Sequence, residues 1–145
     1  MKNKLVSLCL ALAFLLAFSG TVAAEAWDPD RTGSISVTLV SKDGETPMEG
    51  AELSIYHVAT VSADEAGSLF YAYTQAFAGC DISLDDPELV TKLDVFLGEH
   101  SVDCRKILTD SQGKAVCENL PLGLYFVKQT GEVEGFAPCT PFLVT

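Results

Sequence analysis

Few residues of this chain combine the types and the spacing that catalysis needs. A thiol nucleophile needs an imidazole and an acid beside it, and Cys104, His57 and an aspartate could supply those types. No G-x-S-x-G elbow or C-G-x-C-W-type sequence accompanies either histidine of the chain, His57 or His100. His57 also falls in phase with the apolar residues of a predicted strand, as a core or edge histidine does. We therefore predict no catalytic residues and no enzymatic activity.

Candidate metal ligands are equally sparse. His100-x-x-x-Cys104 could contribute to a zinc site together with other cysteines, as an alternative to disulfide bonds. The chain, however, has no C-x-x-C knuckle. Asp28-Pro29-Asp30 matches only the start of a calcium loop and lacks the ligands that should come after it. Asp85 and Asp86 are adjacent acids in a context typical of a helix cap rather than of a glycosidase pair. The sequence predicts neither a metal site nor a cofactor.

The first 24 residues have the pattern of a secretory signal peptide. Two lysines precede an apolar core at residues 5–18, and Val22-Ala23-Ala24 supplies small residues before a cleavage site at Glu25. Cleavage after Ala26 is the alternative. Because the apolar run is shorter than the ~20 residues of a spanning helix, we expect membrane contact only through the signal peptide before cleavage. The prediction is a secreted, extracellular protein with a signal peptide at 1–24 and one domain at 25–145.

Four cysteines remain after that cleavage: Cys80, Cys104, Cys117 and Cys139. An even number in an exported chain favours two disulfides, and four cysteines allow three pairings. Cys80 and Cys104 flank a predicted helix, whereas Cys117 and Cys139 lie on neighbouring late segments. We favour the pairs Cys80–Cys104 and Cys117–Cys139. Each bond would close a loop of about 20 residues and stabilise the fold by ~3 kcal/mol.

The mature domain is strongly acidic. The chain has 20 acidic and 9 basic residues. Two of the basic residues, Lys2 and Lys4, belong to the signal peptide, so seven remain against twenty and the mature net charge is −13. Such a surface repels nucleic acid and anionic membranes, and we expect no nucleic-acid partner. About 120 residues suit one domain with one core.

Alternating hydropathy predicts strands along the body of the chain. Residues 35–39 and 51–55 alternate apolar and polar side chains on either side of turns at 42–44 and 47–50. Residues 63–67 are a connecting loop. The segment 69–74 carries Phe70, Tyr71 and Tyr73 and predicts a third strand.

One helix is predicted between the early and the late strands. Asp85-Asp86-Pro87-Glu88 supplies an acidic cap, a proline at the first position and a carboxylate in the first turn. An apolar stripe comes next and ends at Gly98, formed by Leu89, Val90, Leu93, Phe96 and Leu97. We expect a helix at roughly Pro87–Leu97, within an insertion at about 86–98, whose stripe packs on a sheet.

The segment Asp110–Thr145 reads as turn, strand, turn, strand, loop and strand. Asp110-Ser111-Gln112-Gly113 and Asn119-Leu120-Pro121-Leu122-Gly123 are the turns, and Leu124-Tyr125-Phe126-Val127 resumes a β pattern. The segment resembles the end of Cna B-type domains from Gram-positive pilins and surface adhesins (SpaA-like). Their pattern is D-x-x-G-x-x-x-F-x-x-L-P-x-G-x-Y-x-L-x-E. The segment Gly33–Ala59 resembles their first two strands around a D-G turn.

The resemblance implies an all-β, prealbumin-like (Ig-like) sandwich with one inserted α-helix. Domains of this family often form an isopeptide bond between a first-strand lysine and a late Asn or Asp, assisted by a glutamate. Here Leu39 stands at the lysine position and Gln129 at the glutamate position, and no Asn or Asp occurs after Asn119. We therefore expect no such bond, with disulfides as the replacement cross-links.

The resemblance also implies a role. We expect a non-enzymatic structural domain of a secreted or cell-surface pilin or adhesin, a scaffold or spacer whose partners are further domains or other pilin subunits. The sequence stops within the expected closing strand, which predicts a truncated strand, an open sheet edge and a longer parent protein with a sorting signal. The alternative is a binding module in which Phe70–Tyr73 or the helix contacts a host matrix protein or glycan.

Overall fold

The computed structural model of the protein describes residues 27–145, so the predicted signal peptide lies outside the described residues. Within these residues, seven strands, one short 3-10 helix and one α-helix follow one another. In order they are β1 (Thr32–Thr38), β2 (Glu52–Ala63), β3 (Leu69–Tyr73), η1 (Gln75–Phe77), α2 (Leu89–Glu99), β4 (Arg105–Leu108), β5 (Lys114–Pro121), β6 (Gly123–Gln129) and β7 (Phe142–Val144).

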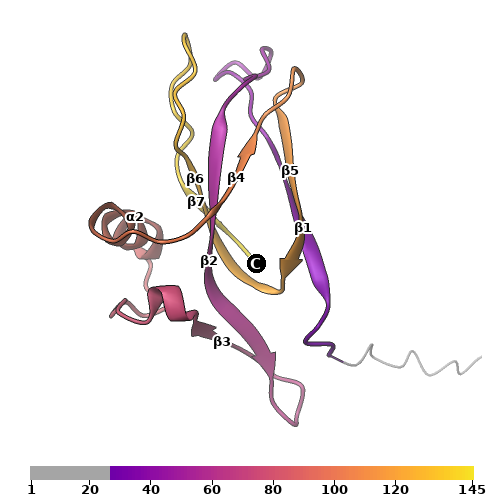
Figure 1. Cartoon of the computed structure of the whole chain (residues 1–145), viewed down its shortest axis with the longest axis vertical. Helices are drawn as coiled ribbons and strands as arrows, with labels where there is room; N and C mark the ends of the chain where they lie inside the picture. Colours follow the sequence, from indigo (N-terminus) through magenta and orange to yellow (C-terminus); the bar gives the residue numbers. More distant parts are fainter. Residues whose placement is uncertain (1–26) are drawn as a thin grey trace, which may run out of the picture.

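The strands form two sheets that face each other (Figure 1). One contains β1 and β5, paired antiparallel. The other has the order β3-β2-β6-β7, with β4 also paired to β2. The long strand β2 bonds β6 along one edge, while its other edge bonds β4 at residues 52–55 and β3 at residues 59–63. This architecture confirms the predicted all-β sandwich with one inserted helix.

The main core lies between the two sheets. Ile35 and Val37 of β1 face Leu53 and Ile55 of β2, which are 0% and 2% exposed. The alternation predicted for the first strand is confirmed, whereas β2 also buries Ser54, which is 1% exposed. The cluster is completed from the loops and the late strands by Leu39, Met48, Ala51, Ala115, Cys117, Leu120, Tyr125 and Val127. Burial of this kind stabilises the fold by about 25 cal/mol per Å² of apolar surface removed from water.

A second core lies between the five-stranded sheet and α2, on the face opposite β1 and β5 (Figure 1). Leu89 and Leu93 of the helix pack with Phe77, Phe126 and other sheet residues, so the predicted apolar stripe does cover the sheet. Because the middle of β6 is buried on both faces, residues 124–127 form a continuous apolar run. The domain therefore has three layers: a two-stranded sheet, a five-stranded sheet and a helix.

Three sequence expectations need correction. The helix begins at Leu89 rather than near Pro87, and its N-cap Glu88 makes no side-chain cap; instead Asp86 Oδ1 accepts from the Glu88 N–H at 2.8 Å, in the turn before the helix. Strand β4 was not predicted, because its four residues hold only one part-buried side chain, that of Ile107. The second late turn is shorter than expected, since β5 continues through Pro121 and β6 begins at Gly123.

Candidate functional site

The turn at Asp110 is built by hydrogen bonds to its own side chain. Asp110 Oδ1 accepts from the backbone N–H of Gln112 at 2.8 Å and of Lys114 at 3.0 Å. These hydrogen bonds hold the pKa of Asp110 below its ordinary value, and the bond from Lys114 has the largest effect. Gly113 adopts φ +72°, and a Cβ there would lie 2.2 Å from the carbonyl oxygen of Leu39. The D-x-x-G residues thus close a turn against the end of β1.

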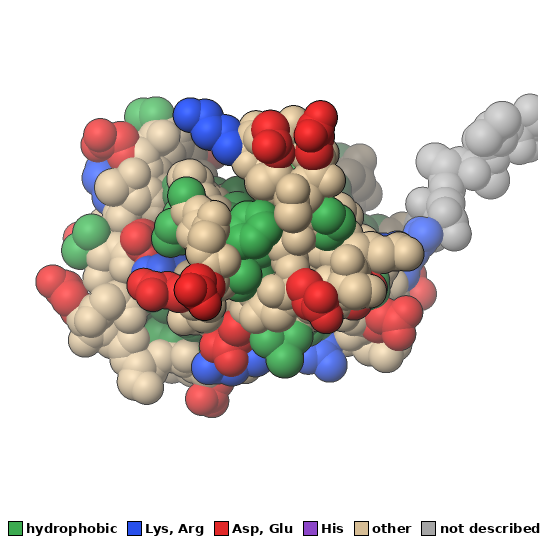
Figure 2. All heavy atoms as spheres, turned by 90° about the horizontal axis from the view of Figure 1, so that it is seen from above, with side chains coloured by type: hydrophobic (Ala, Val, Ile, Leu, Met, Phe, Trp, Pro, Cys, Tyr) green, Lys and Arg blue, Asp and Glu red, His purple; other side chains and the backbone are tan. Residues whose placement is uncertain are grey.

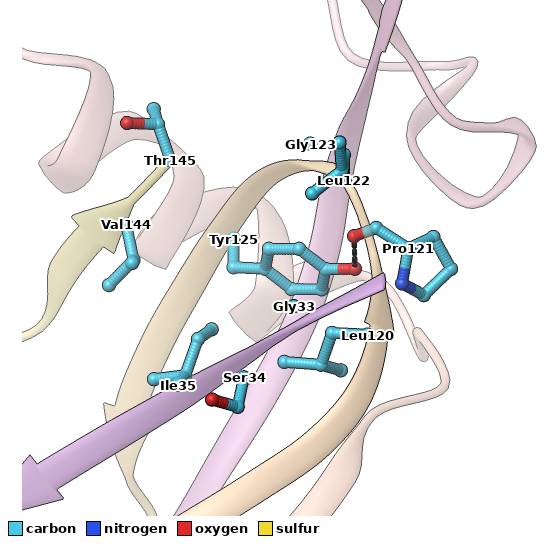
Figure 3. A pocket seen from close by; sticks show the side chains of 10 residues that line it. All are labelled: Gly33, Ser34, Ile35, Leu120, Pro121, Leu122, Gly123, Tyr125, Val144 and Thr145. Carbon is cyan, nitrogen blue, oxygen red and sulfur yellow. Dashed lines mark hydrogen bonds between the residues drawn. The ribbon is translucent and has the colours of Figure 1, made fainter. Parts of the chain in front are cut away.

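The L-P-x-G-x-Y residues form a second structural unit, at the corner between β5 and β6. The Tyr125 hydroxyl donates to the carbonyl oxygen of Pro121 at 2.5 Å (Figure 3). This bond from a tyrosine to the backbone four residues upstream resembles the tyrosine corner of Ig-like sandwiches. Burial raises the pKa of Tyr125 to about 12, so the hydroxyl remains a donor at neutral pH. A cavity of about 90 Å³ beside it is lined by residues of β1, the corner and β7, among them Gly33, Leu122 and Val144.

His57 packs inside the sandwich as a core histidine. Its ring stacks on Tyr125 with 4.6 Å between ring centroids and 10° between planes. Its buried Nε2 has no hydrogen-bond partner in the part of the chain that the structure describes. A Cβ on Gly123 would lie 2.5 Å from that nitrogen, so the glycine of the motif permits the close approach. Desolvation by burial lowers the pKa of His57, with the backbone of Ala59 opposing the shift.

The cysteine, histidine and acid that could have formed a nucleophilic site do not combine. Cys104 and Asp103 border the same open cavity of about 290 Å³ as His57. The Nε2 of His57, however, faces Gly123 of β6, which lies on the edge of β2 opposite β4. Cys104 instead neighbours Tyr56, whose pKa is raised by burial and then by this thiol. The buried Nε2 of the imidazole therefore lies against β6.

Leu39 and Gln129, the two positions where the sequence resemblance predicted isopeptide residues to be replaced, take part in packing and in hydrogen bonding. The Leu39 side chain is 7% exposed and belongs to the main core. The side-chain amide of Gln129 joins two backbone segments: its Nε2 donates to the Gly131 carbonyl oxygen at 2.7 Å, and its Oε1 accepts from the Cys139 N–H at 2.8 Å. Gln129 thus connects the end of β6 to the segment that leads into β7.

All four cysteines of residues 27–145 are free thiols, so neither predicted disulfide is present in this structure. Cys117 is buried in the main core and Cys139 packs against the same cluster, whereas Cys80 packs against the core under the helix. The pairing Cys80–Cys104 and Cys117–Cys139 stays a prediction.

The alternative metal ligands have other contacts. The His100 ring stacks on Phe96 at 4.1 Å, and its Nδ1 lies 2.9 Å from the Phe96 carbonyl oxygen. Asp28 Oδ1 accepts from the Asp30 N–H at 3.0 Å within a turn. Within residues 27–145 no group of three His, Cys, Asp or Glu side chains is placed to hold a metal ion.

The aromatic strand β3 exposes three large apolar side chains in succession. Leu69, Phe70 and Tyr71 are 56%, 51% and 40% exposed, so Phe70 and Tyr71 are not core residues. Tyr73 is part-buried, and its hydroxyl donates to the Ile82 carbonyl oxygen at 2.8 Å. Beside the strand lies a groove of about 420 Å³, lined also by Leu84, Asp85, Leu124 and Thr145.

The remaining surface is acidic and polar. Figure 2 shows carboxylates spread over one end of the molecule, with apolar side chains exposed between them. Lys106 and Glu52 form one of the ion pairs, at 2.9 Å, and this hydrogen bond is the first cause of the lowered pKa of Glu52. Within residues 27–145 no helix has the length and hydropathy to cross a membrane.

No protein-family model matches the chain, and no curated protein matches it. Three solved structures of a Streptococcus pneumoniae pilus protein are similar to it. The pilus backbone RrgB is 16% identical, with a TM-score of 0.42, and the match covers 79% of this chain and 34% of that one. The full-length RrgB pilus protein is 16% identical (TM-score 0.41; 77% and 25% covered), and the full-length major pilin RrgB is 19% identical (TM-score 0.41; 79% and 26% covered). The chain spans a quarter to a third of the length of these proteins, and so distant a likeness carries no function.

Proposed function

We propose that this chain is a non-enzymatic structural domain of a secreted or cell-surface protein of the Gram-positive pilin or adhesin type, where it serves as a scaffold or spacer. One observation carries the proposal: the residues of its most distinctive motif all have structural duties. Asp110 and Gly113 close a turn, Gly123 allows β6 to approach His57, and Tyr125 bonds the backbone of its own corner. The motif residues therefore act in turns, in close backbone packing and in a backbone hydrogen bond.

The shape of the domain supports the same role. The long strands β1, β2, β5 and β6 run along the long axis of the molecule (Figure 1). Their backbone hydrogen bonds and the core between them resist deformation along that axis. A rigid element of this kind fixes the distance between the protein segments attached to its two ends, as a spacer must do.

The cross-linking chemistry is part of the proposal. With Leu39 buried in the core and Gln129 bound to two backbone groups, we propose that the domain forms no isopeptide bond. In an exported protein the four thiols could be oxidised to the predicted disulfides, which would cross-link the domain instead. We further propose that residues 1–24 are removed as a signal peptide and that residues 25–145 form one domain.

Cell fractionation of the bacterium that encodes the protein tests the scaffold role. An antibody against residues 27–145 is used on secreted, surface and cytoplasmic fractions, separated on denaturing gels with and without reductant. We expect the antigen in the secreted or surface fraction, with an N-terminus at Glu25 or Trp27 and in species larger than the single chain. Antigen found only in the cytoplasm, with residues 1–24 still attached, would refute the proposal.

A second candidate function is a surface binding module that recognises a host protein or a glycan. The observation in its favour is the exposure of Leu69, Phe70 and Tyr71 on β3. Apolar side chains gathered on one exposed strand, with a groove beside them, are typical of a contact surface rather than of a spacer.

A further inference from the structure

The free edge of β3 has the hydrogen-bonding groups to accept another strand. Within residues 27–145 this strand pairs only with β2. The Asp64 N–H donates to Ser68 O at 3.0 Å and the Thr74 N–H donates to Val58 O at 2.9 Å, one at each end of the pairing. Since antiparallel bonding alternates along a strand, the N–H and C=O groups of Leu69 and Tyr71 point away from β2. They form an unused row of donors and acceptors.

The side chains of the strand are exposed on both faces. The hairpin of β2 and β3 projects past the end of the β1–β5 sheet (Figure 1). The consecutive residues Leu69, Phe70 and Tyr71 are all exposed, and they line a groove next to Leu84 and Leu124. The strand contains no charge, proline or glycine, the features by which natural edge strands prevent pairing.

The charges around β3 define which strand would fit. Residues 58–91 contain six carboxylates and neither lysine nor arginine. Lys92 lies 2.5 Å from Asp86 and 3.9 Å from Glu88. Among the carboxylates that Lys92 does not pair with, those of Asp64 and Glu65 belong to the turn before β3, and that of Asp85 lines the groove. A second copy of this chain would bring the same carboxylates together and be repelled, whereas a basic segment would be attracted.

We propose that the free edge of β3 binds an extended apolar segment of another protein, flanked by lysine or arginine, by strand addition. Main-chain bonds to Leu69 and Tyr71 provide the pairing, the groove holds an apolar side chain, and Asp64, Glu65 and Asp85 face the basic flanks. This inference rests on the second candidate function, the binding module, and is independent of the scaffold role.

A synthetic peptide provides the first test. The probe KKTVTVTKK is compared with EETVTVTEE by titration into ¹⁵N-labelled protein containing residues 25–145. We expect the lysine peptide to bind about tenfold more tightly than the glutamate peptide, with slowed hydrogen exchange at the amides of Leu69 and Tyr71. Equal binding of both peptides, binding of neither, or protection at other amides would overturn the proposal.

Two variants at one position separate main-chain from side-chain binding. Tyr71→Pro removes the ring and also an N–H that points away from β2, so it breaks no bond within the hairpin. Tyr71→Ala removes the ring only, so the difference between the two variants measures the main-chain bond. We expect Tyr71→Pro to weaken binding about tenfold and Tyr71→Ala a few-fold. Unchanged binding by folded Tyr71→Pro would overturn strand addition; if this variant unfolds, the amide protection in the wild-type protein decides.

The same samples test two other ligands for the β3 surface, a second copy of this chain and a glycan. Sedimentation without peptide should show a monomer, because a dimer that protects the Leu69 and Tyr71 amides would make a second copy the occupant and overturn the proposal. Binding of neutral oligosaccharides that Tyr71→Ala and Tyr71→Pro abolish to the same extent, without protection of the Leu69 and Tyr71 amides in the wild-type protein, would assign the surface to glycans and overturn it as well. Neither result bears on the cell fractionation that tests the scaffold role.

Discussion

Replacement of Gln129 by glutamate probes the contact that connects β6 to the closing segment. The amide donates to the Gly131 carbonyl oxygen at 2.7 Å and accepts from the Cys139 N–H at 2.8 Å. A carboxylate can still accept from the Cys139 N–H, but it places an oxygen instead of an N–H donor next to the Gly131 carbonyl oxygen.

The expected cost comes from these two contacts. Loss of the bond to Gly131 removes about 1 kcal/mol, and a part-buried acceptor facing a carbonyl adds a similar amount, so Gln129→Glu should lower the free energy of unfolding by roughly 2 kcal/mol at pH 7. Because the protonated acid can donate to Gly131 and the carboxylate cannot, the folded state raises the pKa of this carboxyl. The variant should therefore regain stability below the ordinary glutamate pKa of about 4.3 and lose it as the pH rises through the raised value.

Urea unfolding monitored by far-UV circular dichroism measures the effect. Wild type, Gln129→Glu and Gln129→Ala are compared at neutral pH and near the pKa of glutamate, each variant relative to wild type at the same pH. The alanine variant loses both side-chain bonds, so its deficit should not change with pH, whereas the deficit of the glutamate variant should shrink in acid. A glutamate deficit that stays constant, or a glutamate variant as stable as wild type at pH 7, would refute the assignment of these bonds.

Gly113, Asp110 and the cysteines each allow a further test. Gly113→Ala should cost about 3 kcal/mol or more, because its Cβ would collide with the Leu39 carbonyl oxygen at 2.2 Å, whereas Gly44→Ala, at a similar φ with no atom within 4 Å, should cost about 1 kcal/mol from backbone strain alone. Equal costs in urea unfolding would contradict the close approach. Since the pKa of Asp110 is lowered in the folded state, its carboxylate should stabilise the domain above the ordinary pKa of 3.8, and this contribution should be lost as the pH falls. Asp110→Asn should therefore make the free energy of unfolding less dependent on pH in acid. An unchanged pH dependence would exclude this contribution. Mass spectrometry of the secreted protein under non-reducing conditions should find the two predicted disulfides, and four alkylatable thiols would exclude them.

Local pattern was enough to predict most of the fold. Alternation at residues 35–39 and 51–55 marked two strands because each has one face in the main core. The turns at Asp110 and Asn119 were evident from glycine, proline and aspartate in places where the backbone reverses. His57 was expected as a core or edge histidine and is half-buried, with no hydrogen-bond partner for Nε2 within residues 27–145. Its stack on Tyr125 depends on the pairing of β2 with β6 and has no local signature.

Tertiary context decided the features that sequence could not predict. Strand β4 forms because β2 offers an edge, to which Arg105–Leu108 pair with mostly exposed side chains. Exposure of β3 could not be read from Phe70 and Tyr71, since aromatic strands are usually buried. It results from the projection of the hairpin beyond the smaller sheet, which depends on the length of β2 relative to β1 and β5.

The proposed spacer role makes the closing strand the critical element. A spacer under tension is loaded through the segments that lead into β1 and out of β7. Strand β1 pairs with β5 at six positions, while β7 pairs with β6 at only three, from Tyr125↔Val144 to Val127↔Phe142. A covalent cross-link between an early and a late strand would bear this load directly. Here Leu39 and Cys139 line one cavity without such a bond, and the Gln129 amide holds the Cys139 backbone to the end of β6. The stability of Gln129→Glu therefore reports on the non-covalent contact that reinforces the shortest pairing in the load path.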